Sequence, residues 1–511
     1  MINKSKNINN IKIFGDFQTP KNLANQSLRR ILEKLPFTPS SLIEPTCGKG
    51  TFLIEAIKIF PEANSVVGIE VNTEYFDELK AKIKSLEIEK DFKIINDNFF
   101  AVNWSKIITD LPEPILIIGN PPWITNSSLG SMKAKNLPEK NNFQGMNGVE
   151  AITGKSNFDI SESMILEYFK WLKNKRGAVA ILCKTGVARK ILSQIWKNKK
   201  PIEYAAIYNI DASFNFNAAV DACLFFVLLG KQGVYECDVF KDITSKNMLS
   251  RVGYRDNILL FDIDKYKDLE FLNKKDPFYK WRSGIKHDCS KIMELTQQDG
   301  VLINGLGEIV DIEENYLYPL LKSSDIGNGR IKECRKKGIV TQKTVGEDTS
   351  KIKLIAPNTW NYLQAHSDKF FLRKSSIYKN KPIFSIFGIG DYSFSPWKVA
   401  ISALYKKLTF FAISPISDKP VMFDDTVYFL SCRSKSEADF ICDLLNSKEA
   451  HSYLESMIFW NEKRPITIDI LKRLSLANLA KLLNCYEDYL KHVTLHEEDL
   501  ISQNKQRAFC F

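Results

Sequence analysis

The first half of the chain alternates short apolar runs with amphipathic stretches of helical length. Because parallel strands need crossover helices, this alternation predicts βαβ units and an α/β fold with a doubly wound, mostly parallel sheet. The predicted strands span residues 42–44, 66–70, 92–95, 115–119, 178–183, 204–208 and 222–229. The predicted helices span residues 23–34, 51–59, 74–84, 161–174 and 186–197. Residues 234–240 follow a Gly-Lys-Gln-Gly turn, which predicts an antiparallel hairpin with strand 222–229 at a sheet edge.

A chain of 511 residues is too long for one hydrophobic core, so we expect more than one domain. The alternation stops near residue 240, where the sequence becomes irregular, basic and aromatic. Helical patterns return at residues 436–446, 449–459 and 469–474. We therefore predict a first domain over residues 1–240, an α+β domain over 241–480 and a helical tail over 481–511.

Composition narrows the choice of partners. The net charge of +11 favours a nucleic-acid backbone as partner, although many other proteins share such an excess. The ten cysteines include no C-x-x-C pair, so we predict no metal site and reduced thiols. The longest apolar run, residues 222–229, is far shorter than the ~18 residues that cross a bilayer. Without a secretory signal at the N-terminus, we expect a cytoplasmic protein with no membrane contact.

The stretch Asn120-Pro121-Pro122-Trp123 follows the apolar run 115–119. Neither proline can donate to a ladder, so the strand must end at Asn120, at the sheet edge where open α/β folds bind ligands. The Asn120 side-chain oxygen and the Pro121 carbonyl are two acceptors, and the Trp123 indole offers a face for stacking. The stretch therefore predicts a site for an amino group on a flat heterocycle.

Three earlier strands each end in a carboxylate, namely Glu44, Glu70 and Asp97. The turn that follows strand 42–44 is called the first turn below. In dinucleotide folds an acid about twenty residues beyond this turn holds the ribose hydroxyls, and Glu70 occupies that position. The first turn lacks both phosphate-binding glycine motifs, and Glu44 there favours a cationic ligand. Together these residues predict a site for a nucleoside that carries a positive charge and no pyrophosphate, and S-adenosylmethionine is such a molecule. Small residues in the first turn let a cofactor approach the backbone; these are Cys47, Gly48 and Gly50.

In this order the motifs resemble those of the γ-class DNA adenine-N6 methyltransferases, the type II restriction–modification enzymes with a C-terminal target recognition domain. Phe17-Gln18-Thr19-Pro20 resembles the N-terminal motif, whose threonine, here Thr19, contacts the methionine carboxylate. Residues 44–50 resemble the first cofactor motif. Glu70 matches the ribose-binding acid, and Asp97 matches the acid that binds the cofactor's adenine amino group. Asn120 to Trp123 matches the catalytic N-P-P-Y/F/W motif.

The resemblance implies a Rossmann-like sheet of seven strands, S-adenosylmethionine as cofactor, and duplex DNA from which an adenine is flipped out. It also implies a monomer on DNA, with a separate cognate restriction endonuclease as an optional partner. One departure is Asn98, where relatives often carry an aromatic against the cofactor's adenine. In this family an aromatic late in the catalytic domain stacks on the flipped base, and here the spacing to Val220 favours Phe216 for that role, with Phe214 close behind. Because the chain starts close to its first motif, we expect no nuclease domain ahead of it.

Two other functions stay open. An N-P-P-Y/F/W site suits any planar amide or amine, so an RNA or protein-glutamine N-methyltransferase is the enzymatic alternative. A non-catalytic DNA specificity subunit is the other, but an intact Asn120 and three intact acids argue against it. The basic second half suits DNA recognition, since lysine and arginine neutralise phosphates. Residues 384–398 and 461–464 resemble recurring stretches of such recognition domains.

Overall fold

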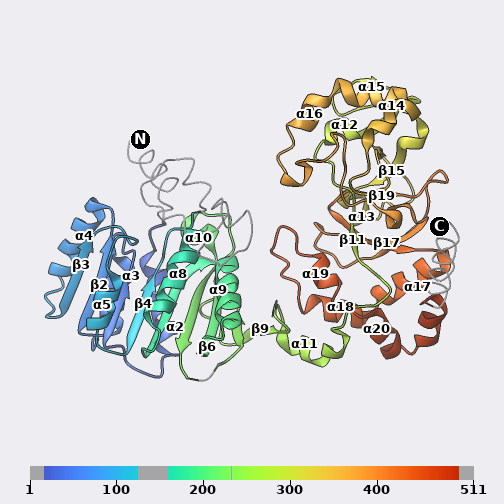
Figure 1. Ribbon diagram of the computed structural model, residues 1–511. Helices are drawn as coiled ribbons and strands as arrows, with labels where there is room; N and C mark the ends of the chain where they lie inside the picture. The colour runs from blue at the N-terminus through green and yellow to red at the C-terminus, as the bar shows by residue number, and fades with distance from the viewer. Residues whose placement is uncertain (1–16, 125–158, 232, 494–511) are drawn as a thin grey trace. The chain divides into compact units, whose positions relative to one another are not determined.

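The computed structural model describes residues 17–124, 159–231 and 233–493. The chain divides into two compact units, Met1–Ile263 and Asp264–Phe511 (Figure 1). The first unit continues past residue 240, where the sequence placed the boundary, because two further strands extend its sheet. Among the described helices, none is both long and apolar enough to cross a bilayer.

The first unit is built on one sheet of ten strands, and all seven predicted strands are present in it. Their order is β10-β9-β8-β6-β7-β5-β4-β1-β2-β3, so β3, β2, β1, β4 and β5 form a parallel block. The strands are β1 (Ser41–Glu44), β2 (Ser65–Glu70), β3 (Asp91–Asn96), β4 (Ile115–Gly119), β5 (Gly177–Lys184), β6 (Ile202–Ile210), β7 (Ala222–Leu229), β8 (Glu236–Phe240), β9 (Met248–Arg255) and β10 (Ile258–Leu260).

The predicted hairpin between residues 222–229 and 234–240 is wrong. Strand β7 lies between β5 and β6 and is antiparallel to both, while β8 pairs in parallel with β6. Strand β7 is apolar on both of its faces and buried along nearly its whole length, so an inner position suits it better than an edge. The Val234 amide donates to the Ile202 carbonyl oxygen at 2.8 Å, which leads the chain to the other side of β6.

Helices cover both faces of this sheet. Alternate residues of β4, such as Leu116 and Ile118, share a core with α2 and α3, and the intervening Ile115 and Ile117 are equally buried. The five predicted helices are confirmed, whereas α5 and α10 are too short for a periodic pattern to reveal them. The helices are α2 (Lys21–Leu32), α3 (Thr51–Ile59), α4 (Thr73–Lys84), α5 (Trp104–Asp110), α8 (Ile160–Trp171), α9 (Thr185–Lys197) and α10 (Ala212–Phe216).

The second unit mixes helices with two smaller sheets, ordered β14-β13-β12-β16-β15-β19 and β11-β20-β17-β18. Its strands are β11 (Arg282–Ser283), β12 (Glu294–Gln298), β13 (Val301–Ile303), β14 (Ile309–Val310), β15 (Leu317–Leu321), β16 (Lys336–Ile339), β17 (Trp397–Ser402), β18 (Phe411–Ile413), β19 (Met422–Phe423) and β20 (Val427–Cys432). Most of its strand pairs are antiparallel, as an α+β domain requires.

Short helices complete the second unit, and the three helices predicted near its end are present. They are α11 (Ile263–Asp268, which starts at the unit boundary), α12 (Ser290–Met293), α13 (Ser323–Gly327), α14 (Ile352–Ile355), α15 (Pro357–Ala365), α16 (Ser367–Phe371), α17 (Lys435–Leu445), α18 (Lys448–Glu455), α19 (Ile468–Leu471) and α20 (Leu476–Leu482). Of the predicted tail over 481–511, residues 486–493 are helical, and residues 494–511 lie outside the described part of the chain.

Candidate active site

Four neighbouring parallel strands deliver their last residues to one edge of the sheet. In the order β4-β1-β2-β3 these strands end beside Asn120, Glu44, Glu70 and Asp97. A cavity of about 150 Å³ lies at this edge. Most of the predicted site residues line it, namely Thr19, Glu44, Cys47, Gly48, Glu70, Asp97, Asn98, Asn120 and Pro122.

Glu70 ties two of the turns together. Its Oε2 accepts from the Gly48 amide at 2.7 Å, and its Oε1 accepts from the Asn72 amide at 2.7 Å. A carboxylate has about four lone-pair sites in all, so one group can accept from several donors. The Gly48 backbone has φ +52°, and a Cβ there would lie 2.9 Å from Gln18 Nε2, so glycine lets the N-terminal motif close on the turn.

Glu44 is a buried carboxyl in the cavity wall, with 2% of its surface exposed. Its Oε2 has no hydrogen-bond partner among the described residues. Burial raises the pKa of Glu44 well above its ordinary value, and the nearby Glu70 carboxylate raises it further. Without a ligand the carboxyl is therefore biased towards the neutral form, and a cation placed in the cavity would favour its ionisation.

The side-chain amide of Asn120 is oriented by the N-terminal motif. Its Nδ2 donates to the Phe17 carbonyl oxygen at 2.8 Å and to Thr19 Oγ1 at 3.3 Å. Its Oδ1 is buried and, within the described residues, has no partner; the same is true of Thr46 Oγ1, which also lines the cavity. Buried polar atoms normally find a partner, so these two acceptors mark a site for ligand donors.

Trp123 packs into an aromatic cluster instead of lining the cavity. Its ring centroid lies 5.4 Å from that of Phe17 and 5.0 Å from that of Phe216, the latter edge to face. Its Nε1 donates to the Leu182 carbonyl oxygen at 3.3 Å. The two candidate stacking residues differ in solvent exposure. Phe216 packs against Trp123 and is 8% exposed, whereas Phe214 is 85% exposed.

Two further predicted residues lie outside the cavity lining. Gly50 begins α3 with φ +78°, and a Cβ there would lie 2.2 Å from Leu79 Cδ1, so this glycine serves the turn and helix packing. Pro121 is buried in the turn that follows β4. Among the described residues, no group of three or more His, Cys, Asp or Glu side chains is placed to hold a metal ion.

The cavity also has apolar walls that the sequence did not reveal. Phe100 lines it, because Asn98 Oδ1 accepts from the Phe100 amide at 3.0 Å and so shapes the turn after β3. This places an aromatic ring next to Asn98, the position at which relatives of the family often carry the aromatic itself. Val71 and Tyr75 line the cavity from the segment after β2. Their closeness in sequence to Glu70 was the available signal.

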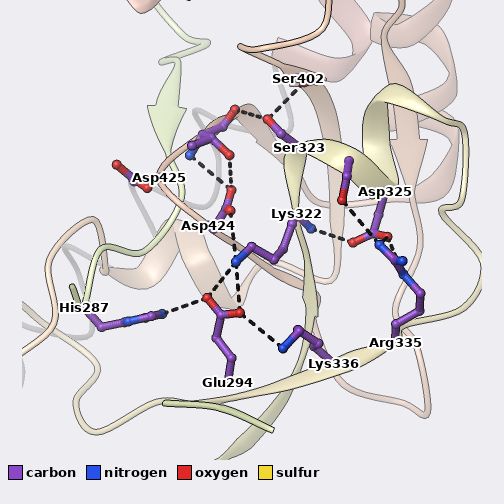
Figure 2. A network of polar contacts seen from close by, with 12 residues as sticks. His287, Glu294, Lys322, Ser323, Asp325, Arg335, Lys336, Ser402, Asp424 and Asp425 are labelled. Carbon is purple, nitrogen blue, oxygen red and sulfur yellow. Dashed lines mark hydrogen bonds and ion pairs between the residues drawn. The ribbon is translucent and has the colours of Figure 1, made fainter. Parts of the chain in front are cut away.

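The second unit contains a buried charge network of its own (Figure 2). Glu294 is 4% exposed, and Lys322 Nζ donates to its two oxygens at 2.8 and 2.9 Å. Lys336 Nζ and His287 Nε2 each lie 3.6 Å from the same carboxylate. Lys322 also lies 3.8 Å from Asp424, and both follow strands that pair in parallel, β15 and β19. The network therefore ties several turns of this unit together.

The two stretches that resemble recognition motifs differ in exposure. Lys398 is 1% exposed, and its Nζ donates to the Ser395 carbonyl oxygen at 2.6 Å. Burial lowers the pKa of Lys398 to about 7, so this lysine belongs to the core. Arg464, by contrast, has 42% of its side chain exposed and lies 4.0 Å from Asp425.

Comparison with known proteins shows the family to which this chain belongs. The N-6 DNA methylase family model matches residues 5–203. Type II methyltransferase M.NspV of Nostoc sp. is 49% identical over 473 residues, which cover 92% of this chain and 98% of that protein. Type II methyltransferase M.CvrRI of Paramecium bursaria Chlorella virus XZ-6E is 30% identical over 113 residues, 22% of this chain and 25% of that protein.

Among solved structures, the type IIL restriction–modification enzyme MmeI in complex with DNA is similar in fold. The TM-score is 0.52 at 13% identity, and the match covers 89% of this chain and 64% of that chain. Fold, site and relatives define a DNA methyltransferase of a restriction–modification system. The chain belongs to the type II methyltransferase family that includes M.NspV, which confirms the resemblance seen in the sequence.

Proposed function

We propose that this protein transfers a methyl group from S-adenosylmethionine to the N6 amino group of an adenine flipped out of duplex DNA. The observation that carries the proposal is the buried, unpaired Oδ1 of Asn120 at the edge of a cavity walled by carboxyl groups. An acceptor with its lone pairs free suits an N–H donor, and a carboxyl-lined cavity suits a cationic ligand. The match to the N-6 DNA methylase family model supports the choice of N6.

The residues of the cavity fit S-adenosylmethionine, which when bound would supply a methyl group activated by a sulfonium charge. Glu44 would face the cationic end, since its buried carboxyl lacks a partner for Oε2 among the described residues. Glu70 would accept from the ribose hydroxyls, and Asp97 from the adenine amino group. Thr19 would contact the methionine carboxylate, as the resemblance implies. Val71 and Phe100 offer apolar surface for the adenine ring.

Asn120 and Pro121 would prepare the target nitrogen. The lone pair of a purine amino group is delocalised into the ring, so the nitrogen is a poor nucleophile. Acceptance of one N–H by Asn120 Oδ1 and of the other by the Pro121 carbonyl oxygen favours a tetrahedral nitrogen with a free lone pair. The contacts from Phe17 and Thr19 hold the Asn120 amide in the orientation that this role needs. Such preorganised acceptors and positioning supply most of the rate. The nitrogen lone pair forms the new bond to the methyl carbon as the bond from that carbon to sulfur breaks, and the methylated nitrogen then releases one proton to solvent.

Two aromatic residues would hold the flipped base. Trp123 would stack on one face and Phe216 on the other, with Phe214 as the alternative. A base between two parallel rings needs a gap of about 7 Å, twice the carbon contact distance. The rings of Trp123 and Phe216 are 5.0 Å apart and edge to face, so they would have to separate when a base enters.

We propose that the second unit recognises the DNA target. The whole protein would act as a monomer, in the cytoplasm. The excess of Lys and Arg over the whole chain supports a phosphate-backbone partner. Methylation of the target would protect host DNA from a separate cognate endonuclease. The family shown by the relatives supports this role over the RNA or protein-glutamine alternatives and over a non-catalytic specificity subunit.

The test is incubation of the protein with methyl-labelled S-adenosylmethionine and duplex DNA, followed by digestion to nucleosides. We expect the label in N6-methyladenine. Label confined to cytosine would contradict the proposal, and so would label found only in RNA or protein when these are offered in parallel reactions. Sequencing DNA from an expressing host for modified adenines would then give the recognition sequence and the substrate for the experiments below.

A further inference from the structure

We propose that Lys184 and Asp159 form a positioning pair that fixes the backbone of the catalytic turn at Trp123. Lys184 is the last residue of β5, and its Nζ donates to the Trp123 carbonyl oxygen at 3.0 Å and to Asp159 Oδ2 at 2.7 Å. The inference rests on the proposed role of the Asn120 to Trp123 turn, and neither residue was singled out by its sequence context.

Strand pairing explains how Lys184 reaches the turn. Strands β4 and β5 are parallel, with Gly119 opposite Ile181, so the end of β5 runs beside the turn that follows β4. Leu182 accepts from the Trp123 indole, and Lys184 donates to the Trp123 carbonyl. The end of one strand is therefore hydrogen-bonded to both the ring and the backbone of Trp123.

Asp159 is itself held rigidly. Its Oδ1 accepts from the Ser161 amide at 3.1 Å and from Ser161 Oγ at 2.5 Å, which makes it the N-cap of α8. The next amide, of Ile160, donates to the Ile124 carbonyl oxygen at 2.9 Å. The start of α8 is thus tied to the residue after Trp123 by a main-chain hydrogen bond, and through Lys184 to Trp123 itself.

The burial of the pair argues for positioning over stability. The side chains of Asp159 and Lys184 are 6% and 25% exposed. Desolvation offsets much of the attraction in a buried ion pair, and an apolar pair of similar volume is often equally stable. The cation does, however, donate one hydrogen bond to the Trp123 carbonyl oxygen, beside the proposed methyl acceptor site, and a second to Asp159 Oδ2. A displacement of about 1 Å at such a site can lower a rate ~100-fold.

The test is the double variant Asp159→Asn/Lys184→Met, compared with the wild-type protein on a duplex that carries the recognised site. Asparagine retains the N-cap acceptor, and removal of both charges leaves no buried ion without its partner. We expect kcat and the single-turnover rate of methyl transfer to fall about 10- to 100-fold. KM for DNA, the dissociation constant of S-adenosylmethionine and the melting temperature should stay close to their wild-type values.

Two further variants sharpen the test. Lys184→Arg keeps a cation and more than one donor, so it should restore a large part of the rate that the double variant loses. The matched control is Glu167→Gln/Lys170→Met, which removes a more exposed ion pair of the same 2.7 Å length near the C-terminal end of α8. The control should retain the wild-type rate.

A double variant with the wild-type single-turnover rate would overturn the inference. So would a loss of rate matched by an equal loss of cofactor affinity and of melting temperature, because that pattern indicates a purely structural pair. The proposed function is judged separately by the base that the wild-type protein methylates. Methylation of another base would refute N6 specificity, while the rate of that reaction would still report on the pair.

Discussion

The Nδ2 of Asn120 donates to the main-chain carbonyl oxygen of Phe17, 2.8 Å away and 103 residues earlier in the sequence. This bond fixes which end of the amide faces the site, because it engages the nitrogen and leaves Oδ1 without a partner among the described residues. The acceptor role of Asn120 thus depends on the N-terminal motif as well as on its own turn.

Asn120→Ala should lower methyl transfer at least ~10²- to 10³-fold, because it removes one preorganised acceptor from the target nitrogen. Binding of DNA and of S-adenosylmethionine should persist, since the basic residues of the chain and the carboxyl groups of the cavity are unchanged. Single-turnover kinetics with labelled cofactor, beside a gel-shift assay, would measure the two effects. Unchanged turnover would refute the role of this residue.

Glu44→Gln should weaken binding of S-adenosylmethionine and remove a pH dependence from it. The pKa of Glu44 is raised in the free protein by burial and by Glu70, and a bound cation would lower it again. Wild-type binding should therefore strengthen as the pH rises from about 4.3, the ordinary value, through the raised pKa, with release of a proton. Calorimetry in buffers of different ionisation enthalpy would detect that proton.

In the protein without cofactor, the stability contributed by Glu44 should change with pH in the opposite direction to the binding affinity. A raised folded-state pKa means that stability is fully present below the ordinary pKa and is lost as the pH rises through the folded value. The wild type should accordingly lose stability relative to Glu44→Gln with increasing pH. Parallel pH curves of binding and of unfolding for the two proteins would show that Glu44 does not titrate as described.

Substitution by leucine should affect stability and methyl transfer differently at Phe216 and at Phe214. Phe216→Leu keeps an apolar side chain in the core beside Trp123 and should cost less than about 1.5 kcal/mol of stability. It removes the ring proposed to stack on the base, so methyl transfer should fall. Phe214→Leu changes an exposed ring and should shift stability by at most about 0.5 kcal/mol.

The fluorescence of 2-aminopurine at the target position would report base stacking in both variants. A fall in transfer rate with altered fluorescence for Phe214→Leu, and neither change for Phe216→Leu, would assign the stacking role to Phe214.

Glu294→Gln should destabilise the second unit by about 1–3 kcal/mol, because it removes one counter-charge of Lys322, whose side chain is 32% exposed and which retains Asp424 at 3.8 Å. Glu333→Gln, which alters an exposed acid of the same unit, is the control and should change stability little. Chemical denaturation followed by circular dichroism would compare them. Equal stability of both variants would show that the network adds nothing to the fold of this unit.

The strand ends of the first unit were predictable because their pattern is local. Each of Glu44, Glu70 and Asn120 ends or directly follows a short apolar run, and parallel strands bring such ends to one edge. The site could therefore be inferred without knowing the strand order. Length limited the same reasoning for α10, whose five residues carry no helical period, and so for the environments of Phe214 and Phe216.

The sequence by itself determined the α/β class, the sheet edge at which Glu44, Glu70 and Asp97 meet, and the turn that begins at Asn120. Each of these depends on a few consecutive residues. Only the tertiary structure decided where β7 lies, that Gly50 serves packing, and that Lys184 reaches the Trp123 carbonyl. These features arise from pairing between segments far apart in the chain. The free energy of such pairing depends on which buried surfaces meet, and no local pattern in the sequence records that choice.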